Sequence, residues 1–143
     1  MIVLYDAECG FCRWAMAWAV RRDHRHVLVI VPIQSPLGSE LLVDVVPGER
    51  LRSAHVVRED GRRRSGGAAA AEGLSALPAT RALGRLACRM PRTAALLYGA
   101  VAARRKSFGR FVGQEARRRA DELLAETSAA SAAELELRSR SRA

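Results

Sequence analysis

The apolar positions in the first part of the chain form short runs with a helical segment between them. Residues 2–5 are an apolar run, and in 10–22 the apolar positions recur at helical spacing. This spacing puts Trp14 and Trp18 on one helix face, and we expect both side chains to lie in the core. Residues 27–31 are a second run without polar alternation, typical of a strand covered on both faces. Strand, helix and strand within such a short segment predict two parallel strands.

Turn residues divide the following segment into further elements. Ser35 and Pro36 are typical of a helix start, and residues 54–58 are expected to be a third strand. A turn at 59–61 then predicts a hairpin with a polar edge strand at 62–65, before a helix at 68–77. The predicted order, β-α-β-α-β-β-α, is that of an α/β domain with a thioredoxin-like arrangement.

The rest of the chain is expected to be a helical C-terminal extension. Helices are predicted at 79–90 and 92–106, each with Ala and Leu on one face. A segment in which Ser, Ala and Arg alternate closes the chain and is predicted to be disordered. The expected parts are a thioredoxin-like domain at 1–106, a basic amphipathic helix at 107–127 and a disordered tail at 128–143.

The charge of the chain is strongly positive. Its formal net charge is +9, and this comes from arginine, because Lys106 is the only lysine. Such a chain attracts anions, including nucleic acids and acidic lipid surfaces. The arginines are scattered, however, and neither an aromatic-rich binding strand nor zinc-finger spacing accompanies them. We therefore expect a solvated arginine-rich surface and no specific binding of nucleic acid.

The compartment is suggested by the apolar stretches and the cysteines. The longest apolar stretch, 14–20, is much shorter than the roughly 20 residues that cross a bilayer, and no signal-peptide pattern opens the chain. Three cysteines are too few for a disulfide scaffold. We expect a cytoplasmic protein without a transmembrane segment, in which a Cys-x-x-Cys pair is catalytic or metal-binding more often than structural.

Cys9 and Cys12 are the candidate site, because they lie between the first strand and the first helix. The N–H groups and the dipole at a helix N-terminus stabilise an anion, which would favour a Cys9 thiolate. Cys12 is one turn away and could attack a mixed disulfide at Cys9. Asp6 and Glu8 would oppose the thiolate and Arg13 would favour it, so the thiolate fraction of Cys9 stays open.

Other chemistry at these cysteines has less support. His24, His26 and His55 could complete a zinc site, but a whole helix separates the first two from the cysteines, and a structural zinc needs four ligands. We therefore expect neither a metal nor a cofactor. The third cysteine, Cys88, follows Leu86 and an alanine on an apolar helix face and is expected to be a buried structural thiol.

The motif around the cysteines resembles that of the DCC family of thioredoxin-like, thiol-disulfide oxidoreductase-like proteins, named for an Asp followed by two Cys. Those three residues are here Asp6, Cys9 and Cys12. The resemblance covers roughly residues 2–110 and includes Val31-Pro32-Ile33-Gln34, Asp60-Gly61, Ser65-Gly66-Gly67-Ala68, Tyr98, Val101-Ala102 and Arg104-Arg105. It implies a thioredoxin-like fold and a dithiol activity.

The roles expected from the motif are a nucleophile at Cys9 and a resolving thiol at Cys12. Asp6 has two interpretations: it exchanges a proton with a cysteine, or its carboxylate accepts backbone N–H bonds and orders the loop. Thioredoxins also place a cis-proline before the third strand, facing the dithiol, whereas residues 51–54 contain no proline. Either Ser53 supplies that backbone contact, or the substrate binds differently.

The sequence therefore predicts an enzyme, a thiol-disulfide oxidoreductase. Its substrates would be protein or small-molecule disulfides, and its reductant is unidentified. The alternative is a non-enzymatic interaction or redox-sensing module that binds a protein partner or an anionic membrane surface through its basic helices, with peripheral membrane contact.

Overall fold

The structure is a computed structural model that describes residues 1–140, six of them (Lys106, Glu134, Glu136 and 138–140) in backbone only. The strands are β1 (Ile2–Tyr5), β2 (Val29–Pro32), β3 (His55–Val57) and β4 (Arg63–Ser65). The helices of the described chain are α1 (Gly10–Arg22), α2 (Pro36–Leu41), α3 (Pro47–Arg50), α4 (Gly66–Ala76), the 3-10 turn η1 (Pro78–Thr80), α5 (Arg81–Arg89), α6 (Pro91–Phe111) and α7 (Gln114–Arg140).

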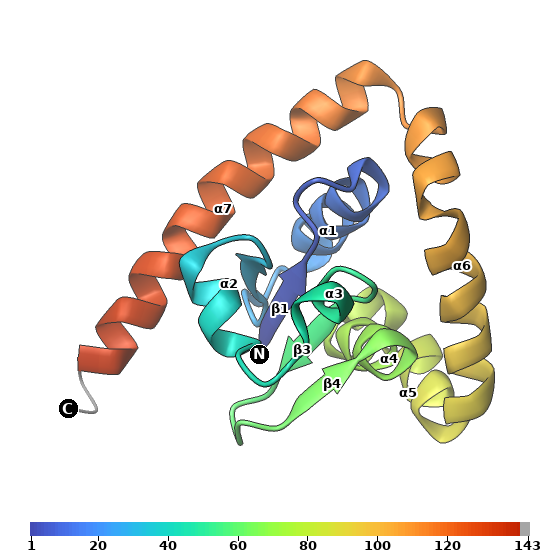
Figure 1. Cartoon of the computed structure of the whole chain (residues 1–143), viewed down its shortest axis with the longest axis horizontal. Coiled ribbons are helices and arrows are strands. Elements are labelled where there is room, and N and C mark those ends of the chain that lie inside the picture. Colours follow the sequence, from blue (N-terminus) through green and yellow to red (C-terminus); the bar gives the residue numbers. More distant parts are fainter. Residues whose placement is uncertain (141–143) are drawn as a thin grey trace.

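The four strands form one sheet in the order β2-β1-β3-β4 (Figure 1). β1 and β2 are parallel, with Leu4 opposite Val31, while β3 is antiparallel to both β1 and β4. The predicted parallel pair and the hairpin between β3 and β4 are thus confirmed. The molecule is a mixed α/β protein consistent with a thioredoxin-like fold, as expected from the order of its elements.

β1 lies at the centre of the core and is buried on both faces. Val3 and Tyr5 point to one face, where they pack against clusters built with α1, α4 and α7. Leu4 points to the other face and packs with Val31 and Leu42 near α2. This two-sided burial explains why the strand is an unbroken apolar run, and it fixes the end of β1 from which the cysteine loop emerges.

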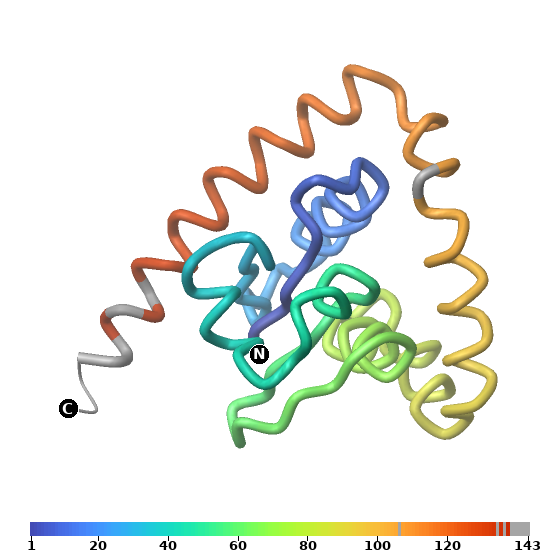
Figure 2. Tube along the Cα trace, in the orientation of Figure 1, coloured from blue at the N-terminus to red at the C-terminus, as the bar shows by residue number. Residues whose placement is uncertain are grey.

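The two long C-terminal helices lie on different sides of α1 (Figure 2). The predicted boundary between them is wrong, because α6 continues to Phe111 and the basic helix begins only at Gln114. The chain is extended at Val112, and Gly113 is a poor helix former, so the break falls there. Among the described residues, none of the helices combines the length and apolar character that a membrane-spanning segment requires.

The predicted disorder of 128–143 is also wrong as far as Arg140, because α7 continues through these residues. Ala120, Leu124 and Ser131 are buried on one face of α7. The Ser131 hydroxyl accepts the N–H of Ile30 at 3.2 Å and so satisfies an outward N–H of edge strand β2. The small, polar residues of this segment form a packing face rather than a flexible tail, and residues 141–143 lie outside the described part.

Candidate active site

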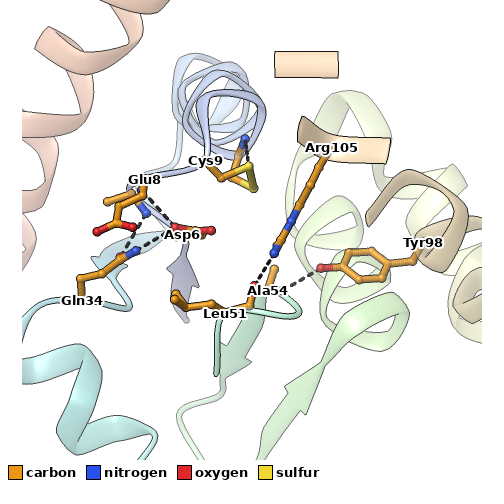
Figure 3. The surroundings of a disulfide bond; sticks show 10 residues. Asp6, Glu8, Cys9, Gln34, Leu51, Ala54, Tyr98 and Arg105 are labelled. Atoms are coloured by element: carbon orange, nitrogen blue, oxygen red, sulfur yellow. Dashed lines mark hydrogen bonds between the residues drawn. A yellow bond between two sulfur atoms is a disulfide. The ribbon is translucent and has the colours of Figure 1, made fainter. Parts of the chain in front are cut away.

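The two cysteines lie at the start of α1, in the turn that follows β1. Cys9 is the N-cap of α1, and it forms a disulfide with Cys12, whose Cα lies 5.1 Å from that of Cys9. The backbone N–H of Cys12 donates to the Cys9 sulfur at 3.2 Å (Figure 3). A helix-terminal N–H therefore points at the sulfur on which a thiolate would form when the disulfide opens.

Two arginines, Arg13 and Arg117, lie near this turn, and each contacts a C-terminal helix. The guanidinium of Arg13 pairs with the Asp121 carboxylate at 3.0 Å, so its charge is partly balanced by α7. Arg117 of α7 donates to the Gly109 carbonyl, and its Nε lies 4.0 Å from where a Cβ on Gly10 would be. α7 thus places a cation, Arg117, beside the motif, which could not be expected from the sequence.

Asp6 is held in a hydrogen-bonded loop beside the cysteines. Its Oδ1 accepts the N–H of Glu8 at 3.0 Å and the Gln34 side-chain amide at 2.7 Å. The carbonyl of that amide accepts the N–H of Ala7 at 3.1 Å, which closes the network (Figure 3). These contacts favour the interpretation in which Asp6 orders the loop.

Gln34 is a site residue whose role sequence reasoning missed. It follows β2 as Asp6 follows β1, and the ends of the two strands lie side by side, with Tyr5 opposite Pro32. Because parallel strands end at the same edge of a sheet, two polar residues in these positions could have been expected to meet.

α6 holds the stretch before β3, which is where the sequence lacks the thioredoxin proline. The N–H of Ala54 donates to the Tyr98 hydroxyl at 2.7 Å, and Arg105 donates to the Leu51 carbonyl at 2.6 Å. Figure 3 shows both side chains reaching from α6 to this stretch. Two backbone groups of this stretch, the Ala54 N–H and the Leu51 carbonyl, are therefore already hydrogen-bonded within the protein.

Two glycines at the start of α4 let α6 come close enough to make these contacts. Gly66 has a positive φ of 61° and lies against the Tyr98 ring. A Cβ on Gly67 would lie 2.7 Å from the backbone of Ala94 and Ala95 in α6, closer than real contacts allow. These glycines serve helix packing, which the sequence alone did not reveal.

A cavity of about 300 Å³ lies beside the disulfide. Cys12 is part of its wall, together with side chains from β1, α1, β3, α4 and α6. Most of the lining is apolar, and the polar residues among it include Asp6, Ser53 and Arg105.

Aromatic side chains gather around the motif. The ring of Phe11, between the cysteines, lies 6.0 Å from that of Trp14 and 5.6 Å from that of Phe108 in α6. The expectation that Trp14 lies in the core is wrong, since 37% of it is exposed, whereas Trp18 is half-buried. Trp14 precedes Trp18 by one turn, near the N-terminal end of α1, where this helix face is no longer covered by the core.

The other candidate residues lie away from this site. Cys88 is exposed, and the prediction of a buried thiol is wrong, because α5 packs on α4 at Gly84 and Cys88 lies one turn beyond that contact. His55 is buried: its Nε2 donates to the Arg50 carbonyl at 2.9 Å, and its Nδ1 pairs with the Ser65 hydroxyl at 2.8 Å. Burial lowers the pKa of His55 below its ordinary value. Within the described residues, no group of three or more His, Cys, Asp or Glu side chains is arranged to hold a metal ion.

A family model described as DCC1-like thiol-disulfide oxidoreductase matches residues 3–111. The chain belongs to this family. The resemblance seen at Asp6, Cys9 and Cys12 is thereby confirmed, and the family's description points to thiol-disulfide oxidoreductase activity. Neither a curated protein nor a solved structure is significantly similar to the chain. α7 begins after the last residue that the family model matches.

Proposed function

We propose that the protein catalyses thiol-disulfide exchange, with Cys9 as the nucleophile and Cys12 as the resolving thiol. The observation that carries this proposal is the position of Cys9 as N-cap of α1, where its sulfur accepts the N–H of its disulfide partner. The same N–H would stabilise the thiolate of the reduced protein, and Cys12 needs no movement of the fold to reach Cys9.

The reaction has two exchange steps. The Cys9 thiolate attacks one sulfur of a substrate disulfide, a mixed disulfide forms, and the other substrate sulfur leaves as a thiolate that takes a proton from water. Cys12 then gives up its proton, and its thiolate attacks the Cys9 sulfur and displaces the second substrate thiolate. Two electrons pass from the dithiol to the substrate, and a reducing compartment such as the cytoplasm would return the protein to the dithiol.

Asp6 acts in this proposal as a positioning residue. Its Oδ1 holds the N–H of Glu8 and the amide of Gln34, which fixes the loop that carries Cys9. Asp6→Asn keeps an acceptor oxygen but removes the charge, whereas Asp6→Ala removes both. Positioning predicts that Asn retains most of the exchange rate and that Ala loses most of it. If Asp6→Asn lost as much of the exchange rate as Asp6→Ala and also changed its pH profile, the role of Asp6 would be proton transfer instead.

The activity is tested by the rate at which the reduced protein reduces bis(2-hydroxyethyl) disulfide. Cys9→Ser should abolish the reaction, and Cys88→Ser is the matched control, because Cys88 is the exposed cysteine away from the site. Equal rates for the wild type and Cys9→Ser would refute the proposal. A loss of activity in Cys88→Ser would instead mean that Cys88, and not Cys9, is the reactive thiol.

A second candidate function is binding to an anionic membrane surface. The observation in its favour is a set of exposed leucines among arginines on α5 and α6: Leu83, Leu86, Leu96 and Leu97 with Arg85 and Arg89. Such a face suits an interface that is apolar and negatively charged. Sedimentation with anionic but not neutral vesicles, weakened by salt, would support it, and equal recovery with both vesicle types would exclude it.

A further inference from the structure

The cavity beside Cys12 has the size of a small-molecule site. Its volume of about 300 Å³ lies at the lower end of the roughly 300–1,000 Å³ that ligand pockets occupy. It is also about twice the ~150 Å³ of an apolar cavity that holds benzene. The cavity therefore fits a molecule of a few rings or a short alkyl chain rather than a protein segment.

The walls of the cavity favour an apolar occupant. Side chains such as Met16, Leu28 and Leu74 form most of the lining. Two of its polar side chains are already engaged: the hydroxyl of Tyr98 accepts the N–H of Ala54, and the guanidinium of Arg105 donates to a carbonyl. Burying hydrocarbon against such walls is favourable without any further polar partner.

The aromatic residues of the chain are concentrated around this cavity. The sequence has only two Trp, two Tyr and three Phe, so a random distribution would spread them over the whole fold. Six of these seven line the cavity or touch the Phe11 ring: Tyr5, Phe11, Trp14, Trp18, Tyr98 and Phe108. Aromatic walls beside a reactive group are typical of sites that hold an apolar ligand in a fixed orientation.

The backbone beside the dithiol is arranged against binding an extended peptide. Such a peptide would need main-chain donors and acceptors at residues 51–54. The Ala54 N–H and the Leu51 carbonyl are both taken by side chains of α6. An extended peptide could pair with these two groups only after the Tyr98 and Arg105 side chains moved, whereas a small molecule in the cavity needs neither group.

We propose that the substrate is a low-molecular-weight disulfide with an apolar body that sits in this cavity. The inference rests on the proposed exchange activity. Cys12 lines the cavity, and the sulfur of Cys9 is bonded to that of Cys12, so a substrate held there lies beside the nucleophile. The reduced protein and the disulfide R–S–S–R give the Cys9–Cys12 disulfide and two R–SH, with the two electrons of the dithiol passing to the substrate sulfurs.

The first test compares two disulfides that differ only in apolar length: bis(6-hydroxyhexyl) and bis(2-hydroxyethyl) disulfide. Each rate with the reduced protein is divided by the rate of the same disulfide with dithiothreitol, which removes differences in intrinsic reactivity. Four additional methylenes on each arm predict a normalised preference of at least about tenfold for the longer disulfide. A ratio near unity would overturn the proposal.

Variants then locate this preference in the cavity. Gly73 lies in the cavity wall, and a Cβ added there meets no atom within 4 Å, so Gly73→Leu has room to extend into the cavity and should remove the preference. Gly99→Leu is the matched control, because Gly99 is also a helical glycine with open space around it but does not line the cavity. If Gly73→Leu melts at a much lower temperature than the wild type, Ala102→Leu replaces it, because Ala102 lines the cavity from α6. If the variants with a filled cavity kept the preference for the longer disulfide, the substrate would contact apolar residues outside the cavity, and the proposal would be wrong.

A second measurement separates this proposal from the exchange activity. The thioether bis(6-hydroxyhexyl) sulfide cannot exchange, and its binding to the oxidised protein can be followed by tryptophan fluorescence, because Trp18 lines the cavity. We expect binding to the wild type and to Gly99→Leu and at least tenfold weaker binding to Gly73→Leu. Binding without exchange would keep the cavity site and refute the activity. Absence of binding to the wild type would refute the cavity site, whatever the exchange rate.

Discussion

The hydroxyl of Tyr98 accepts the N–H of Ala54 at 2.7 Å, and Tyr98→Phe removes that acceptor while keeping the ring. A neutral hydrogen bond contributes about 1 kcal/mol net, and a buried N–H left unpaired costs about 1–3 kcal/mol. Both residues are half-buried, so water can reach the freed N–H in part. We therefore expect the free energy of unfolding to fall by about 1 kcal/mol, which lowers the melting temperature by roughly 3 °C.

Amide hydrogen exchange measures this change at the bond itself. A loss of 1 kcal/mol corresponds to an exchange rate about five times faster for amides that exchange through global unfolding, including those of β3. The amide of Ala54 should exchange faster still, because its own hydrogen-bond acceptor is gone. Unchanged exchange at Ala54, with a melting temperature equal to that of the wild type, would refute the conclusion that α6 holds the backbone beside the dithiol.

Three further predictions concern the pH response and the helix contacts of the fold. Because burial lowers the pKa of His55, the unfolded state binds the proton more readily. The contribution of His55 to stability is therefore present above about pH 6.5 and is lost as the pH falls below that value. Urea unfolding between pH 7.5 and 5 should show this loss, and His55→Gln should make the free energy of unfolding less dependent on pH. Leu124→Ala should reduce the free energy of unfolding by about 2–5 kcal/mol, while Leu137→Ala on the exposed side of α7 should change it by less than about 0.5 kcal/mol; equal effects would contradict the docking of α7. Gly67→Ala should destabilise by about 1–3 kcal/mol, since its Cβ would press on α6, whereas Gly73→Ala in the same helix should be neutral or stabilising by up to about 1 kcal/mol in thermal melts.

The sequence predicts the first elements well because their signals are local. The bounds of α1 agree with the predicted 10–22, since one turn leads into it and the polar cluster at Asp23 ends it. Asp23 is buried, and its carboxylate accepts the N–H groups of Val27 and Leu28, which turns the chain into β2. The cysteine motif follows from the same local order, so its place at the helix start could be predicted.

The C-terminal helices could be predicted from their local pattern, but the way they pack could not be, because it depends on tertiary contacts. Ser131 lies on a packing face only because it meets the edge of β2, and in the sequence it is one small polar residue among many. Cys88 has an apolar sequence neighbourhood, yet its side chain is exposed, because no element of the described chain packs over that part of α5 closely enough to bury it. The contacts of Tyr98 and Arg105 with 51–54 join segments far apart in the chain, which no spacing rule brings together.

The most direct test of Cys9 as the nucleophile is to trap the mixed disulfide. In a Cys88→Ser background, the reduced Cys12→Ser protein is mixed with a disulfide, and the adduct is located by mass spectrometry. Because Cys9 is the proposed nucleophile, an adduct should accumulate there in Cys12→Ser, and Cys9→Ser should form little adduct at Cys12. Faster adduct formation at Cys12 in Cys9→Ser than at Cys9 in Cys12→Ser would contradict the assignment of Cys9 as the nucleophile.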